Sequence, residues 1–159
     1  MSGNMFLAIG AMIILTLLTM TINSSILSSA DVSQNSEFTI TGNGVIQSII
    51  EEIRSKSYDL ATANNPDAKV GSFTAPGSLG PAYNESYPNF NDVDDFHNCN
   101  INISTPRAGN YNVRCVVVYV DPDNPDTQLN HVSHAKRVSV TVTSPFMKDT
   151  LRAVHVASF

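Results

Sequence analysis

Residues with the chemistry of a metal site are few in this chain, and most of them are acidic. Asp92, Asp94 and Asp95 crowd three carboxylates into a short stretch. Calcium prefers oxygen ligands of this kind on a flexible loop. A solvated acidic turn has the same composition. We favour the turn, and keep calcium as the alternative.

A second acidic cluster contains Asp121, Asp123, Asn124 and Asp126. Its spacing is similar to the start of an EF-hand loop, but glycine is missing from the sixth position and glutamate from the twelfth. Two prolines lie within the same stretch. The cluster therefore predicts a rigid turn.

Two cysteines, Cys99 and Cys115, flank a turn-forming Pro-Arg-Ala-Gly-Asn sequence. In an oxidising compartment they would join and close a short loop, which stabilises a fold by about 3 kcal/mol through loop entropy. The alternative is a pair of unlinked buried thiols. We predict the disulfide on condition that the chain is exported.

The histidines are scattered, and only His131 and His134 have a spacing that would let them share a metal ion. No third ligand is evident beside them. We therefore predict solvated loop histidines at all four positions, which are His97, His131, His134 and His155. The sequence shows no nucleophile elbow, no glycine-rich phosphate loop and no supported Cys–His pair. We expect neither an enzyme nor a bound cofactor.

Charge is unevenly placed along the 159 residues, which suffice for one modest domain and an appendage. No Asp, Glu, Lys or Arg precedes Asp31, and all nine Lys and Arg residues lie at or beyond Arg54. The net charge of −5 offers no basic surface to a phosphate backbone. Nucleic-acid binding is therefore not expected.

Residues 5–22 are apolar on every face, and uncharged residues extend this segment to Leu27. A helix of about 20 residues spans the hydrocarbon core of a bilayer. Three interpretations are open: a transmembrane anchor, a secretory signal cleaved after the small residues 28–30, or a helix that lies first in lipid and later against copies of itself. No basic residue precedes the segment, which argues against the signal peptide and the ordinary anchor.

We favour the third interpretation, because it gives an all-apolar surface two uses, facing lipid before assembly and a protein core afterwards. The predicted polymerisation core consists of Met5, Phe6, Leu7, Ile9, Ile13, Ile14, Leu15, Leu17, Leu18 and Ile22.

The helix is expected to break near residues 37–44, where three β-branched residues precede Gly42 and Gly44. The break is either a flexible linker or a segment that unwinds on assembly. Beyond it, apolar residues at 45, 46, 49, 50 and 53 form a helical stripe. We therefore predict a stalk over residues 1–59, with an apolar part at 1–30, the break at 37–44 and an amphipathic helix at 45–59.

The remaining residues, 60–159, are predicted to form a loop-rich β head. Residues 61–110 are rich in Pro, Gly, Asn and Ser, and predict a long loop. Strands are expected at 111–120, at 136–143, where valine alternates with polar residues, and at 151–159. An antiparallel meander packed on the amphipathic helix gives an α+β fold.

Four stretches carry a family resemblance: QSIIEEIRSKSYD (47–59), FTAPGSLGP (73–81), FNDVDDFH (90–97) and KRVSVTVTSP (136–145). Together with the apolar N-terminal helix, they make the chain similar to the type IV pilin and type II secretion pseudopilin superfamily. Within it, the chain most resembles poorly characterised pilin-like proteins of the Bacteroidota and Ignavibacteria type.

The resemblance implies the major subunit of an extracellular pilus-like filament, inserted in the inner membrane before assembly and polymerising with itself. Its other partners would be a prepilin peptidase and the pilus assembly machinery. The alternative is a membrane-anchored minor pseudopilin or binding module of a type II-like secretion system. Type IV pilins usually carry Glu at the fifth mature position. This chain has Met5 there if Met1 is the mature N-terminus; the alternative is that the true terminus differs.

Overall fold

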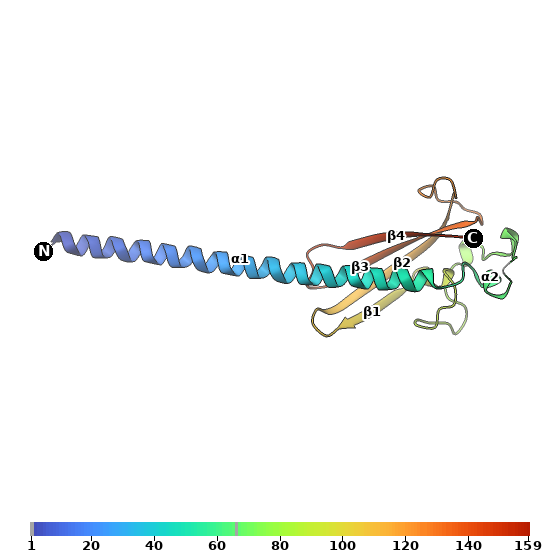
Figure 1. Cartoon of the computed structure of the whole chain (residues 1–159), viewed down its shortest axis with the longest axis horizontal. Helices are drawn as coiled ribbons and strands as arrows, with labels where there is room; N and C mark the ends of the chain where they lie inside the picture. The colour runs from blue at the N-terminus through green and yellow to red at the C-terminus, as the bar shows by residue number, and fades with distance from the viewer. Residues whose placement is uncertain (1, 66) are drawn as a thin grey trace. The chain divides into compact units, whose positions relative to one another are not determined.

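The computed structural model describes residues 2–65 and 67–159 and divides into two compact units, Met1–Glu37 and Phe38–Phe159. A long apolar helix, α1 (Ser2–Arg54), comes first in the chain. A four-stranded antiparallel sheet follows it, formed by β1 (Asn100–Thr105), β2 (Gly109–Val120), β3 (Ala135–Thr143) and β4 (Leu151–Ser158) (Figure 1). The predicted α+β arrangement is confirmed.

The predicted helix break near residues 37–44 is wrong, because α1 runs through this stretch without interruption. Gly42 is buried where the helix backbone approaches the sheet closely. A Cβ atom there would lie 2.8 Å from Leu151 Cδ1 and 3.0 Å from Met147 Sδ. The glycine therefore allows close packing, and the contacts of the surrounding turns outweigh its poor helix propensity.

Helix α1 ends at Arg54, so the amphipathic part is shorter than the predicted 45–59. The chain then turns: the Lys56 N–H donates to the Ile53 carbonyl, and Ser57 forms a parallel bridge with Asp92. Tyr58 and Asp59 are buried directly after this turn.

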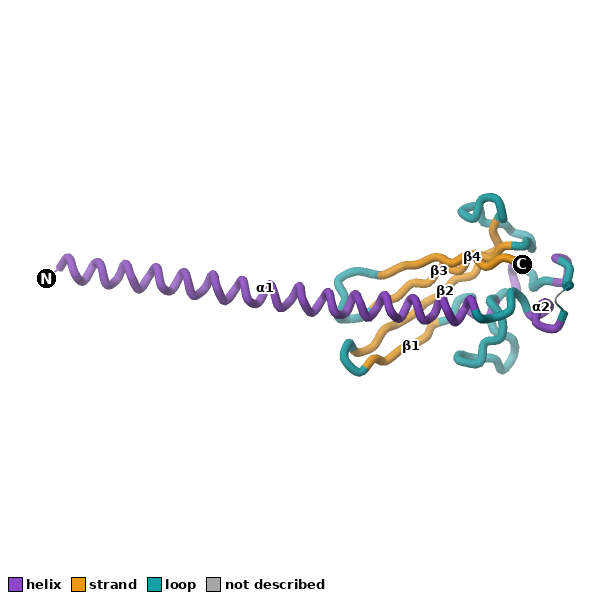
Figure 2. Tube along the Cα trace, in the orientation of Figure 1, coloured by secondary structure: helices purple, strands orange, loops and turns teal. Residues whose placement is uncertain are grey.

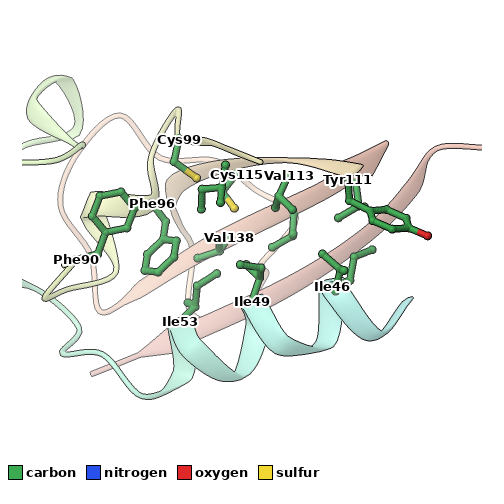
Figure 3. Close-up of a cluster of buried hydrophobic side chains, with 14 of the residues drawn as sticks. Ile46, Ile49, Ile53, Phe90, Phe96, Cys99, Tyr111, Val113, Cys115 and Val138 are labelled. Carbon is green, nitrogen blue, oxygen red and sulfur yellow. The ribbon is translucent and has the colours of Figure 1, made fainter. Parts of the chain in front are cut away.

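The predicted apolar stripe of α1 is confirmed, since Val45, Ile46, Ile49 and Ile53 are buried and Ile50 is partly buried. Ile46, Ile49 and Ile53 face the inner surface of the sheet (Figure 3). The sheet contributes Val113, Cys115 and Val117 from β2, and Val138, Val140 and Val142 from β3. Alternate residues of each strand reach this core, as the pleat of a strand requires.

The strands follow one another across the sheet in the order β1-β2-β3-β4, and every neighbouring pair is antiparallel (Figure 2). The meander of β2, β3 and β4 is as predicted. Strand β1 was not predicted. It lies within the expected loop and pairs with β2, with Ile101 opposite Val113.

The rest of the expected loop is held by short elements and aromatic contacts. Helix α2 (Leu60–Asn64) is followed by three 3-10 turns at Val70–Ser72, Pro76–Ser78 and Asp94–Phe96. Phe90, Val93 and Phe96 enter the main core, while Phe73 packs against Tyr58 and Tyr119 in a second cluster. The head core therefore contains residues from both the loop region and the sheet.

Two glycines of α1 offer a matched test of the continuous helix. A Cβ atom added at Gly44 would have no neighbouring atom within 4 Å. Gly44→Ala should therefore stabilise the head by about 0.5–1 kcal/mol, because alanine favours a helix. Gly42→Ala should destabilise it by about 1–2 kcal/mol through overpacking against Leu151 and Met147. Urea unfolding of the full chain in mild detergent measures both changes, and effects of the same sign would contradict the packed helix.

Candidate functional site

The apolar segment of α1, residues 5–27, exposes a long run of large apolar side chains. All ten residues of the predicted polymerisation core have exposed side chains, from 45% at Ile9 to 74% at Leu7. By length and composition, α1 could cross a membrane. Soluble monomers rarely expose an apolar patch of this extent, so the surface is suited to lipid or to other apolar side chains.

Four hydroxyl groups within this segment are hydrogen-bonded to the helix itself. The hydroxyls of Thr16, Thr19 and Thr21 donate to carbonyls four residues earlier, at 2.8, 2.8 and 2.9 Å. Ser24 donates to the Thr21 carbonyl at 3.0 Å. An unpaired donor would be costly in an apolar environment, and these side chains avoid that cost locally.

The predicted solvated acidic turn is wrong, because Asp92, Asp94 and Asp95 are all buried. Their carboxylates organise the backbone around them. Asp92 Oδ1 accepts from the N–H groups of Asp94 and Asp95, at 2.8 and 3.3 Å. Asp95 Oδ2 accepts from the N–H groups of Asn91 and Asp92. Within residues 2–65 and 67–159, no group of three or more His, Cys, Asp or Glu side chains is placed to hold a metal ion.

A buried polar cluster forms around Lys136 of β3, whose side chain is fully buried. Lys136 Nζ lies 2.9 Å from Asp59 Oδ2, 2.5 Å from Asp94 Oδ1 and 2.8 Å from the Tyr58 carbonyl oxygen. It also lies over the rings of Tyr58 and Tyr119, 4.3 and 5.1 Å from their centroids. We call Lys136, Asp59 and Asp94 the lysine cluster.

The Asp59 carboxylate accepts more hydrogen bonds than the Asp94 carboxylate of the same cluster. Its Oδ1 accepts from the Ala61 N–H and caps α2, and its Oδ2 accepts from the Thr74 N–H as well as from Lys136. Burial alone would raise the pKa of Asp59, but these hydrogen bonds outweigh it and the pKa is lowered. Asp59 is therefore ionised at neutral pH.

Burial has the opposite outcome at Asp94 and Asp92. It raises the pKa of Asp94 to about 6, although the Lys136 charge opposes the shift. It raises the pKa of Asp92 to about 7, helped by the charges of Asp94 and Asp95. Burial also raises the pKa of the Tyr58 and Tyr119 hydroxyls, which donate to the carbonyls of Ser133 and Thr74.

Sequence reasoning missed the lysine cluster. One signal was available: Lys136 is in phase with Val138, Val140 and Val142, so the period of two places it on the inward face of the strand. Asp59 and Asp94 contact Lys136 from segments that are distant in the sequence, so no local sequence pattern predicts this contact.

Cys99 and Cys115 lie side by side in the core (Figure 3). The Cys115 N–H donates to the Cys99 carbonyl at 3.4 Å. A hydrogen bond between the two thiols lowers the pKa of Cys99 and raises that of Cys115. Both are free thiols here, so the structure brings the predicted partners together while the bond itself stays a prediction.

The four histidines and the Asp121 cluster are the remaining residues singled out in the sequence. His97 Nδ1 accepts from the Val117 N–H at 3.2 Å, and His155 lies on β4, so neither is a solvated loop histidine as predicted. His131 and His134 are exposed. The Asp121 cluster forms the expected turn, closed by the Asp121 N–H donating to the Thr127 carbonyl. Comparison with family models, with curated proteins and with solved structures found no match to this chain.

The cysteine pair gives a redox prediction. Full chain recovered from an oxidising compartment should contain a peptide linked through Cys99 and Cys115, detected by mass spectrometry without reduction. Reducing that bond should lower the free energy of unfolding by about 3 kcal/mol. Complete alkylation of both thiols after denaturation without reductant would contradict the disulfide.

Asp92→Asn should flatten the pH dependence of folding stability. The folded state binds the Asp92 proton more tightly than the unfolded chain does, with a pKa of about 7 against 3.8. Wild-type stability therefore falls as the pH rises between these values. The amide keeps an Oδ1 acceptor without titrating, so the variant should gain up to about 4 kcal/mol relative to wild type as the pH rises across this range.

Urea unfolding at several pH values measures this change. Asp123→Asn is the matched control, because Asp123 is exposed in the turn after β2 and its replacement should leave the wild-type slope intact. An unchanged slope in Asp92→Asn would show that Asp92 does not hold a proton in the folded state.

Proposed function

We propose that this chain is a structural subunit of an extracellular pilus-like filament, which assembles when the apolar segments of α1 from many copies pack together. The observation that carries the proposal is the surface of residues 5–27. It is uncharged and exposed, it is apolar on every face over residues 5–22, and four of its hydroxyls are hydrogen-bonded to the helix.

Such a surface suits two environments in succession. Before assembly, a segment of 23 residues, about 35 Å long at 1.5 Å per residue, would span the inner membrane. In the filament the same side chains would contact neighbouring helices. Because lipid and a protein core are similarly apolar, close van der Waals packing between helices would drive the exchange.

The second unit, the head, has its own hydrophobic core. This supports separate roles for the head and for the apolar segment. The main cluster is built from residues of the second unit, with Ile49, Ile53, Val113 and Val140 among its buried members. Changes within residues 5–27 remove none of these contacts. The proposed subunit therefore presents a stable head while its apolar segment exchanges partners.

Helix register in the proposed filament would depend on the fit of the apolar side chains of neighbouring segments. A prepilin peptidase and a pilus assembly machinery are the further partners that this proposal implies.

A membrane-anchored minor pseudopilin or binding module is the second candidate. The observation that favours it is that α1 is long and apolar enough to cross a membrane as a single helix. This candidate predicts a monodisperse, detergent-solubilised monomer that forms no fibres. Negative-stain microscopy of the expressed chain separates the two.

Leu15→Lys should abolish filaments while the head still folds. Leu15 is 64% exposed in the single chain, and a lysine ammonium buried at this position would cost several kcal/mol when water is excluded by neighbouring helices. Negative-stain microscopy measures filament yield, and circular dichroism monitors the head.

Gln34→Lys is the matched control, because it adds the same charge to the same helix at an exposed position outside the apolar segment. It should leave filament yield within about twofold of wild type, since an exposed surface change has little energetic effect. Normal filaments from Leu15→Lys would refute a buried apolar core.

A further inference from the structure

The lysine cluster places an amine in direct contact with a carboxylate oxygen in a buried part of the head. Lys136, Asp59 and Asp94 are each at most 2% exposed. Lys136 Nζ has three neighbouring acceptors, Asp59 Oδ2, Asp94 Oδ1 and the Tyr58 carbonyl, one for each of its hydrogens. The ammonium group is therefore fixed in orientation as well as in position.

The two carboxylates of this cluster differ in how they are held. Asp59 receives backbone N–H groups on both oxygens, from Ala61 and Thr74. No backbone N–H within the described residues donates to the Asp94 carboxylate, whose Oδ1 contacts Lys136 Nζ at 2.5 Å. These hydrogen bonds stabilise Asp59 as a carboxylate anion. Asp94 lacks them, so its carboxylate is more easily protonated.

We propose that Lys136 Nζ and Asp94 Cγ form an intramolecular amide bond, with Asp59 relaying protons. The proposal concerns the head alone and does not depend on filament assembly. It rests on the short Lys136–Asp94 contact, on the fixed Asp59 carboxylate on the other side of Nζ, and on the two tyrosine rings that cover the amine.

The reaction is a condensation that needs no oxidant or cofactor. Lys136 first passes the proton in the Asp94 contact to Asp94, which leaves a neutral amine facing a neutral carboxyl group. The Nζ lone pair bonds to Cγ, and Asp59 takes a second proton from Nζ and returns it to the departing hydroxyl. One Nζ hydrogen stays on the amide, and two leave with one Asp94 oxygen as water.

The surroundings favour each step. Burial raises the pKa of Asp94 to about 6, so proton transfer to it is less costly than to an ordinary aspartate. The fixed geometry supplies the proximity that makes an intramolecular reaction fast. The product replaces a buried ammonium and a buried carboxylate with a neutral amide, which removes the desolvation cost of that ion pair.

The bond would connect the 3-10 turn Asp94–Phe96 to β3 and would enclose β1 and β2 in a covalent loop. The test is mass spectrometry on full-length protein that has been denatured and digested. We expect a branched peptide linking Lys136 to Asp94, with a mass one water below the sum of its two parts. Trypsin should not cleave after Lys136.

Two substitutions control this measurement. Lys136→Arg should lose the branched peptide completely, because its guanidinium does not act as the nucleophile. Lys69→Arg changes an exposed lysine and should keep the bond at the wild-type level. Recovery of wild-type protein with a free Lys136 side chain and the full sequence mass would overturn the proposal, whether or not either variant folds.

Asp59→Asn tests the proton relay. Asparagine caps helices about as well as aspartate, so α2 should keep its start. The variant accepts no proton, and we expect at least a tenfold slower appearance of the branched peptide in a time course after synthesis. A wild-type rate would overturn the role of Asp59. A branched peptide joining Lys136 to Asp59 in the wild type would overturn the choice of Asp94.

Discussion

The packing of one helical stripe on one face of the sheet is the interaction on which the head depends. Ile49 and Ile53 are at most 1% exposed, and they lie against β2 and β3 at the centre of the main cluster. Removing such side chains from a core costs several kcal/mol, which is a large part of the stability of a domain this size. The same contact keeps α1 helical where its sequence alone would not.

Helix α1 contains two kinds of surface. Residues 38–54 need to satisfy a sheet on one side and water on the other, and they show an apolar stripe beside Glu51 and Arg54, which pair at 3.1 Å. Residues 5–22 are exposed and apolar on every face. A helix that contacts a protein core on one side and water on the other has an apolar and a polar face. Residues 38–54 show this pattern, and residues 5–22 do not.

Periodic patterns predicted most of the fold, and non-local contacts explain the failures. Strand β3 was predictable because Val138 and its alternate neighbours repeat every two residues. Strand β1 was missed because its two isoleucines alternate with asparagine and serine, and asparagine is a poor strand former. The helix break was predicted from intrinsic propensity, which cannot register a contact between Gly42 and a residue of β4. The lysine cluster combines three distant segments, so only the inward phase of Lys136 could be read from the sequence.

The close approach at Gly42 also restricts how α1 can slide along the sheet. Moving the helix by one turn would bring Phe38 or Ile46 to the place of Gly42, since a turn contains about 3.6 residues. Leu151, Met147 and Tyr111 already occupy the space that either side chain would require. Apolar stripes tolerate displacement, because one isoleucine can replace another at similar energy. Because only Gly42 lacks a side chain at this contact, the alternative positions of the helix are excluded. Helix α1 therefore packs on the sheet in one axial position.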